Sequence, residues 1–172
     1  MPLGGAIAPS AGNLTDLAAA QALSGSPAAT VSNKLVKTAT AIADSTATLV
    51  ATVKIPNARC SAVLRILIRS MITAASHVGD SVRVVEYLAA VTRQAGGAAV
   101  LVLSSAQGAA IATVSAGNTL TTALAAGSVS GANSATQTIP LNITNVGSVA
   151  GISETSISVE VFNDTAGLVS VS

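Results

Sequence analysis

The side chains that most often do chemistry in proteins are scarce in this sequence. Its one histidine, His77, lies three residues before Asp80 in a segment that we expect to be a loop. An imidazole beside a carboxylate could act as a general base, but catalysis also needs a nucleophile or a metal next to it. Serine is too common along the chain to nominate one residue for that role. We therefore expect His77 to be a loop residue or a pH-sensitive contact rather than a catalytic or metal-binding group.

The carboxylates, the thiol and the glycines add no catalytic pattern. The seven acidic residues are scattered without the spacing of a calcium-binding loop. The single cysteine, Cys60, excludes an internal disulfide framework and a cysteine-based zinc site, because both need several sulfurs, and we expect it to be a buried small hydrophobe. The pairs Gly4-Gly5 and Gly96-Gly97 lack the sequence context of a phosphate-binding loop. A pair of carboxylates that hydrolyses glycosides stays an open alternative, although sugar-binding clefts usually present aromatic residues and this chain has almost none. The prediction is a chain that is not an enzyme and uses no cofactor or metal.

Positive charge is concentrated in one part of the chain. All eight lysines and arginines lie between Lys34 and Arg93, and residues 94–153 carry no charge at all. Nucleic-acid-binding proteins use such patches, but this chain lacks aromatic stacking partners and lysine clusters. Pairing of the arginines with glutamates on a neighbouring strand or subunit is the favoured explanation. The residues that we predict for an interface are Arg65, Arg69, Arg83 and Arg93.

The elements that carry these arginines alternate with a period of two. Residues 60–72 have large aliphatic side chains on one face and arginines on the other, which predicts a core-facing strand with basic residues pointing outward. Residues 81–92 also fit a helix, but their valines and Tyr87 favour a second strand. The set on the predicted core face of residues 60–72 is Leu64, Ile66, Ile68 and Ile72, and the opposite set is Val63, Arg65, Leu67, Arg69 and Met71.

Further strands are predicted before and after this pair. Residues 46–55 alternate, with Leu49 on the core face and Val50 interrupting the pattern. Short apolar runs follow at 100–103, 111–114 and 120–124, separated by glycines, and alternation returns at 139–143, 155–161 and 168–171. Because proline cannot donate a ladder hydrogen bond, Pro140 predicts that its strand lies at a sheet edge or carries a bulge.

Composition indicates an unusual core and a weakly charged surface. Half of the 172 residues are apolar, yet there is one Tyr, one Phe and no Trp, so Ala, Val, Leu and Ile must fill the core. Charged residues make up 9% of the chain and the net charge is +1, whereas about a quarter of an ordinary soluble domain is charged. Such a chain gains little solubility from self-repulsion, which favours a protein that functions in an assembly.

No stretch predicts a membrane span or a secretion signal. Polar residues interrupt every apolar run before it reaches the roughly 20 residues of a spanning helix. The N-terminus has no basic start, and Pro9, Asn13 and Asp16 break its apolar stretch, so we expect a protein made in the cytoplasm.

These patterns predict an all-β protein with eight to ten short strands. Strands at roughly 8 to 12 residue spacing, with Gly and Asn between them, are typical of an antiparallel two-layer β-sandwich, of which the jelly roll is one form. We assign residues 34–172 to this domain. Residues 1–33 are rich in Gly, Ala, Pro and Ser, and we expect them to form an extended N-terminal arm with room for a short helix near residues 14–23.

The layout as a whole resembles the virion structural proteins of tailed bacteriophages. The features that carry the resemblance are the arm that starts at Met1, Pro2 and Leu3, the low charge, the scarcity of aromatic residues, and the abundance of Ala, Thr, Ser and Val in a small β-domain. More narrowly, the chain is similar to jelly-roll decoration or cement proteins. The resemblance implies a homotrimer on a lattice of major capsid protein at the virion surface, with no small-molecule substrate and no nucleic-acid partner. The alternatives are a tail, fibre or receptor-binding module, or a cell-surface or carbohydrate-binding adhesin domain.

Overall fold

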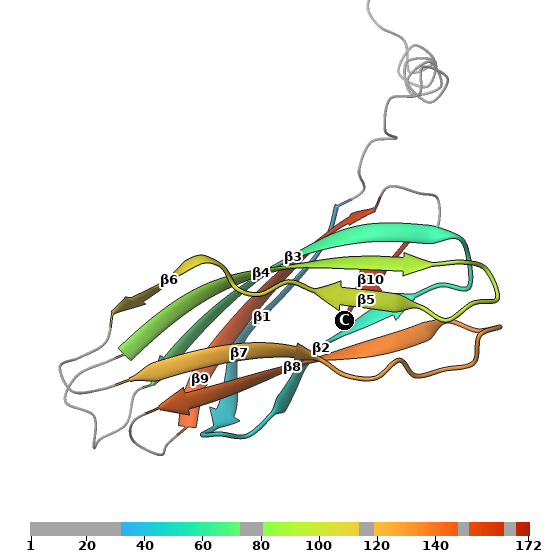
Figure 1. The fold of residues 1–172 in the computed structure, drawn as a ribbon. Helices are drawn as coiled ribbons and strands as arrows, with labels where there is room; N and C mark the ends of the chain where they lie inside the picture. Colours follow the sequence, from blue (N-terminus) through green and yellow to red (C-terminus); the bar gives the residue numbers. More distant parts are fainter. Residues whose placement is uncertain (1–31, 73–80, 114–118, 148–151, 164–167) are drawn as a thin grey trace, which may run out of the picture. The chain divides into compact units, whose positions relative to one another are not determined.

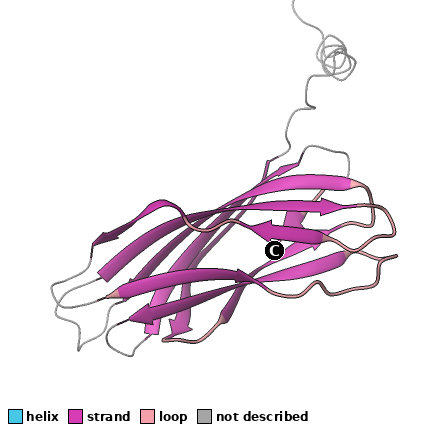
Figure 2. Ribbon diagram, viewed as in Figure 1, coloured by secondary structure: helices cyan, strands magenta, loops and turns pink. Residues whose placement is uncertain are grey.

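The computed structural model describes residues 32–72, 81–113, 119–147, 152–163 and 168–172, which form strands and no helix (Figure 2). This confirms the all-β class. The predicted arm, as far as residue 31, and its helix lie outside the described residues. The predicted loop that holds His77 also lies outside them. The ten strands are β1 (Ser32–Ala43), β2 (Thr48–Ile55), β3 (Cys60–Ile72), β4 (Ser81–Arg93), β5 (Val100–Leu103), β6 (Gln107–Thr113), β7 (Leu120–Ala126), β8 (Gln137–Gly147), β9 (Ile152–Asn163) and β10 (Ser170–Val171).

The strands form two antiparallel sheets (Figure 1). The large sheet has the order β1-β9-β3-β4-β5, and β6 pairs with β4 beside β5. The small sheet has the order β10-β2-β8-β7. Every strand pair is antiparallel, so the predicted two-layer antiparallel architecture is confirmed, while the jelly roll stays a prediction.

Large aliphatic side chains from both sheets meet in one core. Because side chains alternate between the two faces of a strand, every second residue of β3 and β8 points inward. The predicted core residues of β3 are 0–3% exposed, and those of β8 are 0–1% exposed. Tyr87 is buried with them and donates its hydroxyl to the Thr122 carbonyl oxygen at 3.2 Å. The inward residues of β3 are Leu64, Ile66, Ile68 and Ile72, and those of β8 are Ile139, Leu141 and Ile143.

The ambiguous segment after residue 80 is a strand, as predicted. All thirteen residues of β4 pair in an unbroken register with β3, from Ser81 opposite Ile72 to Arg93 opposite Cys60. On its other side β4 pairs with β5 and β6. A helix would leave β3 without this partner, so tertiary pairing supports the strand that the valines and Tyr87 already favoured.

The prediction that Leu49 lies on the core face of β2 is wrong. The register between β2 and β8 shifts between Leu49 and Ala51, so Val50 and Ala51 are both buried and Leu49 is 57% exposed. A bulge adds one residue to a strand and reverses the alternation there. Val50, which interrupts the sequence pattern, marks the position of this irregularity.

Of the two alternatives predicted for the strand of Pro140, the edge position is wrong, because β8 lies between β2 and β7, whereas the pairing of β8 with β2 does carry an irregularity, between Leu49 and Ala51. Thr52 lies opposite Pro140, and its backbone N–H and C=O are both hydrogen-bonded to Ser172. No backbone hydrogen bond therefore joins Thr52 to Pro140. On the other side, the β7 ladder ends one residue before Gly127, whose N–H donates to the Pro140 oxygen at 2.8 Å. A Cβ on Gly127 would lie 2.6 Å from the Pro140 Cγ. A proline fits in this central strand because the neighbouring strand β7 ends beside it and is followed by a glycine.

A fully bonded polar cluster joins the two sheets. Asn145 of β8 accepts a hydrogen bond from Ser70 of β3 at 3.1 Å and donates to Ser153 and Thr155 of β9 at 2.7 and 2.8 Å. All four residues are at most 2% exposed. Buried polar groups stabilise a single arrangement only when their hydrogen bonds are satisfied. These bonds therefore hold the two sheets in one position relative to each other.

Candidate functional site

The outward face of the large sheet carries a row of alternating charges. Lys34 of β1 pairs with Glu160 of β9 at 3.1 Å, and Arg65 of β3 lies 3.8 Å from the other Glu160 oxygen. Arg65 also donates through Nε to Glu86 of β4 at 2.7 Å. The row therefore links four neighbouring strands, and the prediction that Arg65 points away from the core is confirmed.

The contact between Arg65 and Glu86 shifts the pKa of both groups. The hydrogen bond from Arg65, together with its charge, lowers the pKa of Glu86, against a smaller opposing effect of desolvation. The same hydrogen bond raises the pKa of Arg65, and the charges of Glu86 and Glu160 add to it. Both groups stay charged at neutral pH, but their charges are satisfied within the sheet.

Exposed apolar side chains surround this row. The described residues include eleven large hydrophobic side chains that are exposed, and seven of them lie on this outward face. Cross-strand register places Phe162, Val63, Ala90 and Val102 side by side across β9, β3, β4 and β5. The seven residues, which with the charged row we call the outer face, are Val36, Val63, Leu67, Leu88, Val100, Val102 and Phe162.

The outward face of the small sheet differs in chemistry. Its strands present mainly threonines, alanines and an asparagine, and its exposed large hydrophobes on these strands are Leu49 and Val146. Exposed large hydrophobes are therefore concentrated on the outer face rather than on the outward face of the small sheet.

Charge on the outer face is balanced. In the described chain its basic residues are Lys34, Arg65 and Arg69, and its acidic residues are Glu86, Glu154 and Glu160. Arg69 is exposed and lies opposite Ser156 and Val84 in the register. A neutral surface does not require a partner of opposite charge.

The two other predicted interface arginines do not lie on the outer face. Arg83 is half-buried and donates to the Leu120 carbonyl oxygen at 3.1 Å. Arg93 is 3% exposed and donates to the carbonyl oxygens of Ile55, Gly97 and Asn133 at 2.8 to 3.0 Å. These contacts give Arg93 a structural role, since it ties the end of β2 to two connecting segments, the one between β4 and β5 and the one between β7 and β8.

Sequence reasoning missed the apolar part of the outer face. Val63 and Leu67 already lie on the arginine face of residues 60–72 in the sequence pattern, and Phe162 shares the glutamate face of the last long strand. Large apolar residues on a strand face that also carries charge are the signal that could have identified this surface.

The described residues show no metal-binding group. They contain no group of three His, Cys, Asp or Glu side chains that could hold a metal ion, and His77 and Asp80 lie outside them. Cys60 is buried, as predicted. Within the same residues no helix has the length and hydropathy needed to span a membrane.

Comparison with known proteins finds few similarities. No protein-family model and no curated protein matches the sequence. The tailspike protein of Acinetobacter baumannii phage AM24 is similar over 83% of this chain, with 11% identity and a TM-score of 0.45. The tailspike protein of Acinetobacter phage vB_ApiP_P1 is similar over 81% of this chain, with 19% identity and a TM-score of 0.34. The chain spans 28% and 22% of the length of these two proteins, and likeness at this level says nothing about its function.

Proposed function

We propose that this chain is a non-enzymatic structural protein of a bacteriophage virion, and that it assembles through the outer face. The observation that carries the proposal is the concentration of seven exposed large hydrophobes on one face of the large sheet. Burial of such side chains contributes about 25 cal/mol per Å² of apolar surface, which is the usual source of stability in permanent interfaces.

Pairing within the charged row lowers the cost of covering it in such an assembly. Lys34, Glu160, Arg65 and Glu86 already pair with one another, so a partner that covers them need not supply opposite charges. A side chain that keeps its hydrogen-bonded partner on burial avoids much of the desolvation penalty of an isolated charge. A neutral and partly apolar partner surface fits this face best.

The finer proposal is a capsid decoration or cement protein that clamps a lattice of major capsid protein at the virion surface, as a homotrimer. Low charge and small side chains across the chain support this role, since surfaces of this kind lose little when subunits cover them. The proposed role requires no catalytic group.

Co-sedimentation with empty shells of the phage that encodes the chain tests the proposal. We expect the wild-type protein to bind these shells and to raise the temperature at which they open. A double variant, Val63→Thr with Leu67→Gln, should bind at least tenfold more weakly. Its matched control, Val146→Thr with Leu49→Gln, changes the same two residue types at similar exposure on the small sheet and should bind like wild type.

Two results would count against the proposal. Equal binding by the two double variants would show that the outer face does not form the assembly contact. If the protein neither bound nor stabilised the shells, the capsid role would be ruled out. Imaging of labelled protein on virions separates the alternatives, because label on the tail would replace the decoration role with a tail, fibre or receptor-binding role. Binding to cells or glycans by the isolated chain would favour an adhesin.

A further inference from the structure

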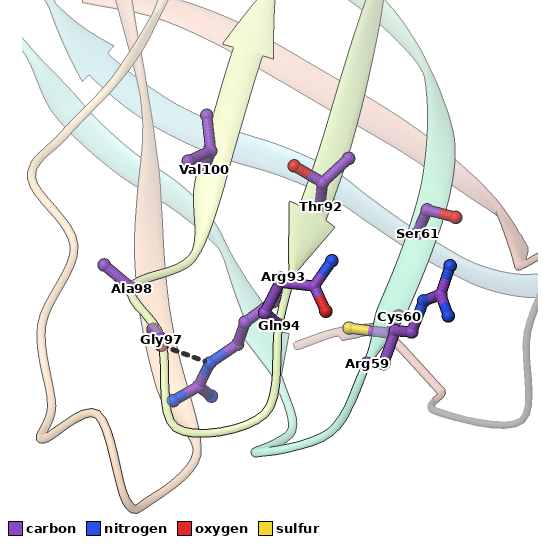
Figure 3. A pocket seen from close by; sticks show the side chains of 9 residues that line it. All are labelled: Arg59, Cys60, Ser61, Thr92, Arg93, Gln94, Gly97, Ala98 and Val100. Atoms are coloured by element: carbon purple, nitrogen blue, oxygen red, sulfur yellow. Dashed lines mark hydrogen bonds between the residues drawn. The ribbon is translucent and has the colours of Figure 1, made fainter.

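A pocket of about 610 Å³ lies at the end of the sandwich where β3 begins and β4 ends (Figure 3). Its walls come from the turn before β3 and from the turn between β4 and β5. Small-molecule sites usually have volumes of roughly 300 to 1,000 Å³, so this pocket is large enough for a small ligand or for one side chain of a partner.

Hydrogen bonds within the chain hold the walls of the pocket in place. Asn57 accepts from the Gly96 N–H at 2.7 Å and donates to the Ser134 carbonyl oxygen at 3.1 Å. Gly97 closes its turn by donating to the Gln94 carbonyl oxygen at 3.0 Å, and Gly96 adopts a φ of 73° that a side chain would strain. The pocket is therefore formed before any ligand arrives, which lowers the entropic cost of binding.

Arg93 places a fixed positive charge beside the pocket. Its three bonds to carbonyl oxygens use three of the five N–H groups of a guanidinium and fix its position. None of the ion pairs in the described residues includes Arg93, although it is 3% exposed. A buried cation without a carboxylate partner leaves a positive potential that an anion nearby would neutralise.

The remaining lining supplies a second cation and neutral donors. Arg59 lies exposed at the rim, and Thr92 and Gln94 add a hydroxyl and an amide (Figure 3). The lining contains no acidic residue, and Ala98 and Val100 give it an apolar part. A planar guanidinium pairs with a carboxylate through two parallel hydrogen bonds, which makes arginine the preferred residue for this ligand.

We propose that this end pocket binds a carboxylate group, with Arg59 as the pairing residue, Thr92 and Gln94 as neutral donors, and Arg93 as a fixed source of positive potential. One accessible guanidinium with neutral donors matches a single negative charge better than a dianion. The carboxylate can belong to a free small acid or to an acidic side chain of a neighbouring protein. The site lies apart from the charged row but shares Val100 with the outer face, so the two proposals are tested by different residues, Arg59 here and Val63 with Leu67 there.

Titration of the isotope-labelled full chain, followed by NMR, tests the proposal with sodium acetate as the probe and acetamide as its neutral isostere. We expect acetate, but not acetamide, to shift the Arg59 Nε–H and Gln94 side-chain amide signals in a saturable way. The variant Arg59→Gln should raise the acetate Kd at least tenfold. The control Arg69→Gln removes an exposed arginine from the outer face and should change the Kd less than twofold.

Two further probes distinguish the sources of the carboxylate. Glucuronate represents a free small acid, and N-acetyl-aspartate amide represents an acidic side chain of a protein; the tighter binder identifies the source. The proposal is overturned if acetate produces no saturable shift, if acetamide produces the same shift, or if Arg69→Gln weakens binding as much as Arg59→Gln. Melting curves of the two variants that match wild type would show that neither result comes from unfolding.

Discussion

Replacement of Arg93 by methionine separates a structural role from an interface role. Methionine keeps most of the apolar stem but removes the hydrogen bonds to Ile55, Gly97 and Asn133. Hydrogen bonds to charged groups contribute about 1.5 to 3 kcal/mol each, and the Ile55 oxygen would be left buried without a partner. The other two oxygens are part-buried and can bond to water, and removal of the charge also removes its desolvation cost.

These opposing effects give an expected loss of about 2 to 4 kcal/mol in the free energy of unfolding. For a chain of this length that corresponds to a fall in Tm of roughly 6 to 12 °C. Urea and thermal unfolding followed by far-UV circular dichroism measure both quantities. The exposed Arg69→Met variant is the control, and it should stay within about 0.5 kcal/mol of wild type.

The reasoning is refuted if Arg93→Met is as stable as Arg69→Met. Normal stability together with weakened assembly would instead return Arg93 to the predicted interface. Amide hydrogen exchange adds a local check, because the segments that Arg93 ties together, residues 94–99 and 127–136, should lose protection first in the variant.

Three further predictions concern single contacts. Asn145→Ala removes the centre of the buried polar cluster and should cost about 2 to 4 kcal/mol, seen as a lower urea midpoint with an unchanged slope. Gly127→Ala places a Cβ 2.6 Å from the Pro140 ring and should cost about 1 to 3 kcal/mol, and a second change, Pro140→Ala, should recover much of that loss in a double-mutant cycle; additive losses would contradict the contact. Arg65→Met should raise the pKa of the Glu86 carboxyl towards its ordinary value in an NMR titration. Because the folded-state pKa of Glu86 is lowered, the pair stabilises the fold above the unfolded pKa and loses this effect as the pH falls through the folded pKa; an unchanged pKa in the variant would contradict the assignment.

Much of the fold could be predicted where one strand face is clearly more apolar than the other. In β3 the aliphatic residues Leu64, Ile66 and Ile68 alternate with Arg65 and Arg69, and burial follows that pattern. Prediction failed where the chain departs from simple alternation. The irregularity at Leu49 and the glycine end of β7 beside Pro140 depend on the partner strand, which no local pattern reveals.

Two of the four predicted interface arginines were placed correctly on the outer face, for the same reason. Arg65 and Arg69 lie on a strand whose two faces differ strongly, so their outward direction followed from the sequence. Arg83 and Arg93 lie on β4, where both faces carry several valines, and alternation alone cannot say which face is inside. The register of β4 against β3 places Tyr87 and both arginines inward, which removes them from the outer face.

The sequence by itself determined the class of the protein and the composition of its surfaces. Period-two alternation requires strands, and the scarcity of charge and aromatic side chains requires a core of small and branched residues with a weakly charged exterior. Only the tertiary structure decided which residues meet: the charged row from Lys34 to Glu86, the seven apolar residues around it, and the pocket between two turns. These arrangements depend on pairing between strands far apart in the chain, because cross-strand register, and not sequence distance, sets which side chains are neighbours.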